Sequence, residues 1–289
     1  MRDPESYQDS FPEPTRPGRR PRRFDDDGPA RRRGARPDPG GLAEIDERAD
    51  TDPDGPPSGD RWSTWDGAEH GPRPRPAWVV TEHAAVDTEL GMIKAGKEAD
   101  VHLIERGVPG TERRTLMAAK RYRTAFGRDI LSGQWASAEF AALSLLWSDG
   151  VAVPYPVQAS GTELLLEFLG TNDGQAAPRL AQLRPSHGEL CDLWHQLVDA
   201  LLGLARHGLT HGDLSAYNLL VHDGRLVLID LPQVVDVIGN PQGPEFLARD
   251  VRRIGEWFTS RGLPPEVGGP EMLLGELRSE VGMPREPGT

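Results

Sequence analysis

The chain has 289 residues, a formal net charge of −12 and a single cysteine, Cys191. The acidic balance argues against a protein that binds DNA by bulk attraction to phosphates, and a lone cysteine excludes an intrachain disulfide. No apolar run approaches the roughly 20 residues that a membrane span needs, and the charged, proline-rich start has no signal-peptide core. We therefore expect a cytoplasmic protein that binds neither membrane nor DNA.

Residues 1–76 are rich in Pro, Gly, Arg and Asp and contain few apolar side chains. This composition cannot offset the entropy lost on ordering, so it predicts a disordered tail. The arginine clusters could contact RNA or an acidic partner, but the interspersed acidic residues favour a solvated polyampholyte. Trp62 and Trp65 are the exceptions, and could dock the tail onto the folded part.

The folded part is expected to open near Trp78, with strands at residues 101–104 and 116–120 joined by a polar loop. Residues 91–100 before them are interpreted as a glycine-containing loop, a weak phosphate-binding signal because it matches no standard phosphate-loop pattern. The only lysines of the chain are Lys94, Lys97 and Lys120. In a chain that otherwise uses Arg, compact ammonium groups at these positions indicate contact with phosphate oxygens, with chance clustering as the alternative.

A helix is predicted at residues 133–148, with Glu139 among small and apolar neighbours. A buried carboxylate is expensive unless paired, so we expect an ion pair with Lys120; the alternative is a partly exposed glutamate. Residues 162–170 then predict a strand that leads into a break between a small and a large lobe. Its backbone could hydrogen-bond an adenine ring, although a simple core strand explains the apolar residues equally well.

The second half of the chain predicts a buried helix that delivers a polar loop. Ser186 opens this helix with capping-box spacing and Gly208 ends it. A further amphipathic helix is expected at residues 245–259. From about Gly262 the chain is expected to be loop, with one short helix at residues 271–281.

The polar loop is His211-Gly212-Asp213-Leu214-Ser215-Ala216-Tyr217-Asn218, followed by two apolar strands that flank an Asp-Gly turn and end at Asp230. An aspartate, an asparagine five residues on and a second aspartate after a strand form the set that holds Mg²⁺ and orients a hydroxyl beside a nucleotide's terminal phosphate. We expect Asn218 and Asp230 at opposite ends of the paired strands, both facing one pocket.

These residues resemble the RIO family of atypical serine/threonine protein kinases, and within it the first RIO branch. The resemblance covers roughly residues 80–258. It is carried by Gly96–Val101, Ala119–Thr124, Trp135-Ala136 with Glu139, His211–Ser215 through Asn218, and Ile229–Gln233. It implies an α+β, two-lobed kinase-like fold without the activation loop or the peptide-binding subdomains. We expect an N-lobe at residues 77–166 and a C-lobe at residues 167–285 behind the tail.

The resemblance also implies ATP and Mg²⁺ as cofactors and a role for each matching residue. Lys120 would hold the α- and β-phosphates and pair with Glu139, and Asp213 would accept the proton of the substrate hydroxyl. Asn218 and Asp230 would bind Mg²⁺. The loop Ala95-Gly96-Lys97-Glu98-Ala99 would cover the phosphates, and the backbones of Glu167 and Leu169 would meet adenine. The family's loop usually has Ser-Thr where this chain has Lys94-Ala95.

Three functions remain open at this point. The first is a non-specific protein kinase that phosphorylates Ser or Thr, its own chain included. The second is an ATPase switch that acts on a ribosomal particle during maturation, which the missing peptide-binding elements favour. The third is a small-molecule phosphotransferase of the antibiotic- or choline-kinase kind, which shares His-Gly-Asp and the distal Asn but usually carries an aromatic residue where Leu231 follows Asp230.

Overall fold

The computed structural model describes residues 55–123, 129–231, 234–264, 267 and 269–283. Most of the predicted tail, residues 1–54, lies outside this range. Thr124, Pro232 and Gln233 of the family motifs, and residues 284 and 285 of the predicted C-lobe, also lie outside it.

An antiparallel sheet forms the first half of the described chain. Its strands are β1 (Arg61–Trp62), β2 (Glu69–His70), β3 (Val86–Ala95), β4 (Ala99–Gly107), β5 (Arg114–Tyr122), β6 (Pro156–Ser160) and β7 (Glu163–Glu167). They lie side by side in the order β1-β3-β4-β5-β7-β6-β2. The predicted strands at residues 101–104 and 116–120 are the middles of β4 and β5, and Gly110 in the turn between them has a φ of 76°.

The two faces of this sheet have different partners, because side chains alternate along each strand. On β5, Ala118 and Lys120 face the main cavity of the protein, and Tyr122 packs on Ala136 of helix α1 (Asp129–Ser148). We call this the inner face. Met117 and Ala119 belong to the opposite, outer face, where they are fully buried.

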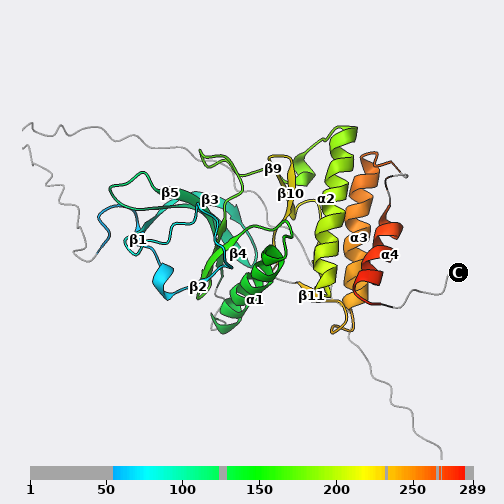
Figure 1. Ribbon diagram of the computed structural model, residues 1–289, viewed down its shortest axis with the longest axis horizontal. Helices are drawn as coiled ribbons and strands as arrows, with labels where there is room; N and C mark the ends of the chain where they lie inside the picture. The colour runs from blue at the N-terminus through cyan, green and yellow to red at the C-terminus, as the bar shows by residue number, and fades with distance from the viewer. Residues whose placement is uncertain (1–54, 124–128, 232–233, 265–266, 268, 284–289) are drawn as a thin grey trace, which may run out of the picture. The chain divides into compact units, whose positions relative to one another are not determined.

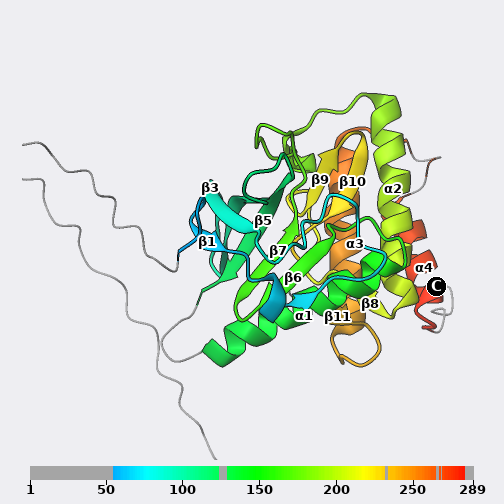
Figure 2. The same ribbon diagram turned by 60° about the vertical axis from the view of Figure 1, so that its left-hand side comes forward.

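The outer face is covered by residues 61–80, which we call the N-terminal strap (Figure 2). Strand β1 pairs with β3, strand β2 pairs with β6, and Trp65 and Val79 pack on Met117. The prediction of a disordered tail is therefore wrong for residues 55–76. The average composition of this stretch does not reveal that it is ordered. Its few apolar side chains are buried against a sheet face that is formed by residues far along the sequence.

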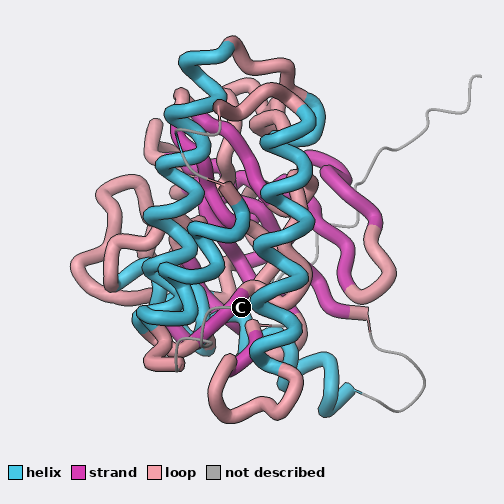
Figure 3. The backbone as a smooth tube through the Cα atoms, turned by 90° about the vertical axis from the view of Figure 1, so that its right-hand side faces the viewer, coloured by secondary structure: helices cyan, strands magenta, loops and turns pink. Residues whose placement is uncertain are grey.

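The second half is mainly helical. Figure 1 shows α2 (His187–Arg206), α3 (Gly243–Ser260) and α4 (Pro270–Glu280) together on the side away from the sheet, and Figure 3 shows them running alongside one another. The predicted capping box is present, since Ser186 N–H donates to Glu189 at 2.8 Å and Glu189 N–H donates to the Ser186 hydroxyl at 3.4 Å. Gly208, with a φ of 71°, follows the end of α2 as expected.

One core joins the two halves. Phe140, Leu143 and Leu146 of α1 pack into the same apolar cluster as Trp194 of α2 and Phe258 of α3. The sheet half and the helical half confirm the predicted α+β, two-lobed arrangement. Its shortened form is confirmed as well, because the chain passes from Asp230 to the start of α3 through residues 231–242 alone. Among the described residues, no helix is both long enough and apolar enough to cross a membrane.

The predicted hairpin is present as β9 (Leu219–His222) and β10 (Arg225–Leu228). Its turn residues Asp223 and Gly224 have φ values of 50° and 75°, as a type I′ turn requires. The expectation that Asn218 and Asp230 lie at opposite ends of the hairpin is wrong. Leu219 pairs with Leu228, and Ile229 N–H donates to the Asn218 carbonyl at 3.0 Å. In an antiparallel pair, the start of one strand and the end of the next share one end.

Candidate active site

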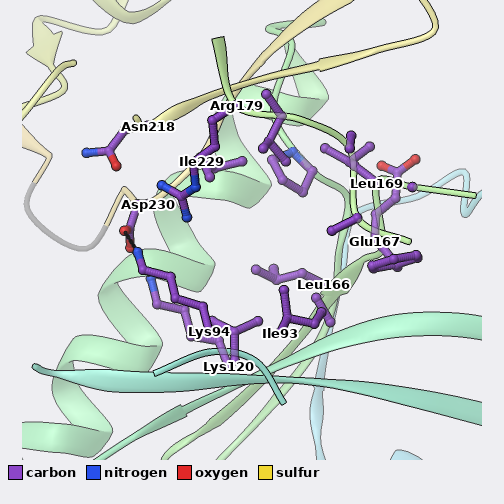
Figure 4. Close-up of a pocket in the computed structure, with 18 of the residues that line it drawn as sticks. Ile93, Lys94, Lys120, Leu166, Glu167, Leu169, Arg179, Asn218, Ile229 and Asp230 are labelled. Atoms are coloured by element: carbon purple, nitrogen blue, oxygen red, sulfur yellow. Dashed lines mark hydrogen bonds and ion pairs between the residues drawn. The ribbon is translucent and has the colours of Figure 1, made fainter. Parts of the chain in front are cut away.

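A cavity of about 1560 Å³ lies between the inner face of the sheet and the β9–β10 hairpin. Figure 4 shows that it has a polar end, where Lys94, Lys120, Asn218 and Asp230 gather, and an apolar end near Leu166 and Leu169. Of the predicted site residues, only Ala95 does not line the cavity. Ala95 is the last residue of β3, so the predicted loop at residues 91–100 is in fact two strands joined by residues 96–98.

The predicted ion pair between Lys120 and Glu139 is present. Lys120 Nζ donates to Glu139 Oε1 at 2.8 Å, and both side chains are buried. Burial alone would lower the pKa of Lys120, but the carboxylates of Glu139 and Asp230 outweigh it and raise that pKa. Lys120 is therefore a permanent cation at neutral pH, held by helix α1 on the inner face of the sheet.

Glu139 connects three parts of the site, a role that sequence reasoning did not identify. Its Oε2 accepts a hydrogen bond from the hydroxyl of Tyr122, and its Oε1 also accepts one from the Leu231 backbone N–H at 3.1 Å. Burial, followed by the negative charge of Glu139, raises the pKa of Tyr122, so the phenol remains a donor. Helix α1, strand β5 and the segment after Asp230 are thereby tied to a single carboxylate.

Asp230 is held by two lysines. Its Oδ1 accepts from Lys120 Nζ at 2.8 Å, and its Oδ2 accepts from Lys94 Nζ at 3.3 Å. Burial by itself would raise the pKa of Asp230, but the charges of Lys120 and then Lys94 lower it to about 2. The residue has a φ of 67°, a left-handed conformation that non-glycine residues rarely adopt. Strain at a charged site residue is typical of functional positions.

The polar loop is organised by its own histidine and asparagine. His211 Nε2 lies 3.1 Å from the Ile229 carbonyl, while its Nδ1 accepts a long bond from Asp213 N–H, so the Nε2-protonated tautomer fits both partners. Asn218 Nδ2 donates to the Asp213 carbonyl at 2.9 Å. These bonds place Asp213, Asn218 and Asp230 around the same end of the cavity.

Asp250 of α3 is the most important site residue that sequence reasoning missed. It is 1% exposed. Its Oδ2 accepts from Gly212 N–H at 2.7 Å and from the Thr210 hydroxyl at 3.0 Å, and its Oδ1 accepts from Leu214 N–H at 3.0 Å. The carboxylate thus fixes the backbone on both sides of Asp213. An aspartate within an amphipathic helix carries no local signal of this role.

The Asp213 side chain is well exposed, at 64%, and pairs with Arg253 of α3 at 2.7 Å. Arg253 is itself half exposed, so the pair is solvent-screened and exchangeable. A hydroxyl group that enters the cavity can therefore reach the Asp213 carboxylate by displacing an exposed partner.

The short loop between β3 and β4 is formed by Gly96, Lys97 and Glu98, which line the cavity. A Cβ on Gly96 would lie 2.5 Å from the Ala99 carbonyl oxygen, so only glycine fits this turn. Gly96 N–H donates to Asp100 at 3.2 Å, and Asp100 in turn pairs with Arg123 at 2.7 Å.

At the apolar end, the chain after β7 leaves few backbone groups for a ligand. Glu167 N–H already donates to the Tyr155 carbonyl, and the Leu169 carbonyl accepts from Ala177 N–H, both at 2.9 Å. In the described part of the chain no hydrogen bond uses the Leu169 N–H. The Leu169 N–H therefore remains open to a ligand at this end of the cavity.

The donor set at the polar end fits Mg²⁺. Within the described ranges no cluster of three or more His, Cys, Asp or Glu side chains could hold a metal ion. Asp230 offers carboxylate oxygens, and the Asn218 amide, whose nitrogen is used by Asp213, offers its oxygen. The chain would thus supply two hard oxygen donors to a Mg²⁺ ion, which would take its remaining ligands from phosphates and water.

Comparison with known proteins identifies the family of this chain. A family model described as "RIO domain" matches residues 111–268, more than half of the chain. The chain belongs to the RIO family of atypical serine/threonine protein kinases. The matched RIO domain includes Lys120, Glu139, Asp213, Asn218, Asp230 and Asp250, whereas the β3–β4 loop precedes it.

Three relatives show the extent of the RIO similarity. The RIO-type serine/threonine-protein kinase Rio1 of Haloferax volcanii is 34% identical over 206 residues, which cover 64% of this chain and 68% of that protein. The serine/threonine-protein kinase RIO1 of Chaetomium thermophilum is 30% identical over 206 residues, 60% of this chain and 40% of that protein. The serine/threonine-protein kinase RIO3 of Bos taurus is 33% identical over 140 residues, 48% of this chain and 27% of that protein. The chain thus spans less than half of the two eukaryotic relatives.

Proposed function

We propose that the chain is an ATP- and Mg²⁺-dependent protein kinase that transfers the γ-phosphate to Ser or Thr hydroxyls, its own included. The observation that carries the proposal is the convergence on one cavity of Asp213, Asn218, Asp230 and the Lys120–Glu139 ion pair. The names of the relatives, which are serine/threonine-protein kinases, support the same class of acceptor. We place this activity in the cytoplasm, with a protein as the second substrate.

Phosphoryl transfer needs positioning and charge neutralisation more than covalent help from the protein. Lys120, oriented by Glu139, binds the α- and β-phosphates. Residues 96–99 cover the phosphates, and the Glu167 carbonyl and Leu169 N–H hold adenine. Asn218 and Asp230 would hold Mg²⁺, which would neutralise charge on the phosphates.

Asp213 orients the acceptor hydroxyl and takes its proton as the hydroxyl oxygen bonds to the γ-phosphorus. The bond from that phosphorus to the bridging oxygen breaks at the same time, and ADP leaves. For this step the Asp213 carboxylate leaves Arg253 and turns to the hydroxyl. Loss of the Asp213 base is expected to lower the rate by about 10²- to 10⁴-fold, which is roughly 3 to 5 kcal/mol of barrier.

The test is incubation of the full chain with Mg²⁺ and γ-labelled ATP, following label on protein and free phosphate together. We expect label on the chain or on an added protein acceptor, lost in Asp213→Asn and in Asp230→Asn. Asp199→Asn is the matched control, because Asp199 is an exposed residue of α2 that does not line the cavity. It should label like the wild type.

Other outcomes contradict the proposal in identifiable ways. Free phosphate alone, dependent on both aspartates, would indicate an ATPase switch. Label that appears only when a small hydroxylated compound is added would indicate a small-molecule phosphotransferase. No turnover despite measurable ATP binding would reduce the site to a nucleotide-binding module.

A further inference from the structure

Lys94 and Lys120 lie in one row across three strands. Lys94 on β3 is paired with Val101 on β4, and Val101 is paired with Lys120 on β5. Cross-strand partners project from the same face of a sheet, so both lysines stand on the inner face. Figure 4 shows the two side chains running next to each other toward Asp230.

Lys94 keeps its place on this face although β3 is irregular. The strand has two register shifts against β4, one between Glu89 and Gly91 and one between Met92 and Lys94, and each adds one residue on β3. Each extra residue reverses the alternation of side chains, so the two together restore it. Met92, which lies between the two shifts, is 59% exposed, whereas Lys94 lines the cavity.

The charges at this end of the cavity balance without a ligand. Lys120 contacts both Glu139 and Asp230 at 2.8 Å, while Asp230 at 3.3 Å is the only carboxylate that Lys94 contacts among the described residues. A cation that takes over Asp230 would leave Lys120 paired with Glu139 but would leave Lys94 without a counter-charge. The Lys94 side chain is 40% exposed on a flexible stem, so it can move to a new anion.

We infer that Lys94 is a second phosphate-binding lysine, held on Asp230 in the nucleotide-free protein and transferred to the β- and γ-phosphates when a nucleoside triphosphate binds. The inference rests on the proposed function and adds a contact that the Lys120–Glu139 pair does not supply. Because AMP has neither a β- nor a γ-phosphate, Lys94 discriminates ATP from AMP.

The test is calorimetric titration of ATP and of AMP into the full chain without divalent metal. Lys94→Met is expected to weaken ATP binding by about tenfold and to leave AMP binding unchanged. Lys94→Arg keeps the charge and should retain most of the ATP affinity. Arg114→Met is the matched control, since Arg114 is an exposed cation on β5 that does not line the cavity, and it should bind both nucleotides like the wild type.

A double-variant cycle tests the exchange itself. Asp230→Asn releases Lys94 and removes a negative charge near the phosphates, so metal-free ATP should bind more tightly. In the Lys94→Met background this gain should be smaller by about threefold or more, because no lysine is left to release. Equal gains in the two backgrounds would overturn the exchange.

The outcomes also separate this inference from the proposed function. A wild type that prefers ATP over AMP, with an unchanged preference in Lys94→Met, overturns the role of Lys94 and leaves the kinase proposal standing. A wild type that binds no ATP overturns both. Retained AMP binding in Lys94→Met shows that this variant is folded.

Discussion

At the scale of single residues, the buried carboxylate of Asp250 is expected to decide whether the polar loop can present Asp213. Asp250→Asn replaces one of two acceptor oxygens with a donor that faces hydrogen-bond donors of the loop. We expect the unfolding free energy to fall by about 2 kcal/mol. We also expect kcat to drop by about 10- to 100-fold while KM for ATP changes little, because Asp250 does not line the cavity. Steady-state kinetics with Asp199→Asn as control checks this; an unchanged kcat would contradict the positioning role.

Glu163 provides a pH test at the same scale. It pairs with Arg61 at 2.6 Å and with Arg121 at 2.7 Å. Burial alone would raise its pKa, but the hydrogen bonds and charges of the two arginines lower it below the ordinary 4.5. The stabilisation is therefore fully present above about pH 4.5 and is lost as the pH falls through the folded-state value.

Glu163→Gln is accordingly expected to lose about 1 kcal/mol near pH 7, a modest value because both arginines are partly exposed. Urea unfolding of wild type and variant at a series of pH values should show this difference shrinking below about pH 4.5. A difference that stays constant across that range would show that the ion pairs do not stabilise the fold.

At the scale of elements, the N-terminal strap is expected to be an integral layer of the sheet domain. Trp65 is 8% exposed, stacks on His70 at 3.9 Å between ring centroids and lies under Arg75. Trp65→Ala should lower the unfolding free energy by about 3 kcal/mol through lost burial and the cavity left behind. Trp62→Ala, at a residue 42% exposed, is the control and should cost about 1 kcal/mol or less. Similar losses in both variants would argue against a packed strap.

At the scale of the whole molecule, the cavity takes one wall from the sheet and the other from the β9–β10 hairpin, so a nucleotide bound in it would contact both halves. Mg²⁺ with a nonhydrolysable ATP analogue at a hundred times its Kd should add about 2.7 kcal/mol to stability. For a chain of this size that raises Tm by roughly 5 to 10 °C in a thermal melt. Asp230→Asn should show a smaller shift with Mg²⁺ present, and an unshifted wild type would contradict nucleotide binding.

Much of the fold and of the candidate site was predictable from the sequence because the signals are local. The capping box at Ser186 and the Asp223-Gly224 turn each act within a few residues, so their spacing alone predicts α2 and the β9–β10 hairpin. The Lys120–Glu139 pair was also predictable, since a carboxylate among apolar helical neighbours needs a cation and the chain has few lysines.

Other features were decided only by the tertiary structure, because they depend on contacts between distant segments. Asp250 gains its role by meeting the backbone around Asp213, and Trp65 by meeting the outer face of the sheet. The shared end of Asn218 and Asp230 is different, because antiparallel pairing in the predicted hairpin already implies it. Lys94 faces Asp230 because pairing across β3, β4 and β5 sets it in one row with Lys120. A periodic sequence pattern does not show which residues of separate strands lie opposite one another until the sheet sets the register.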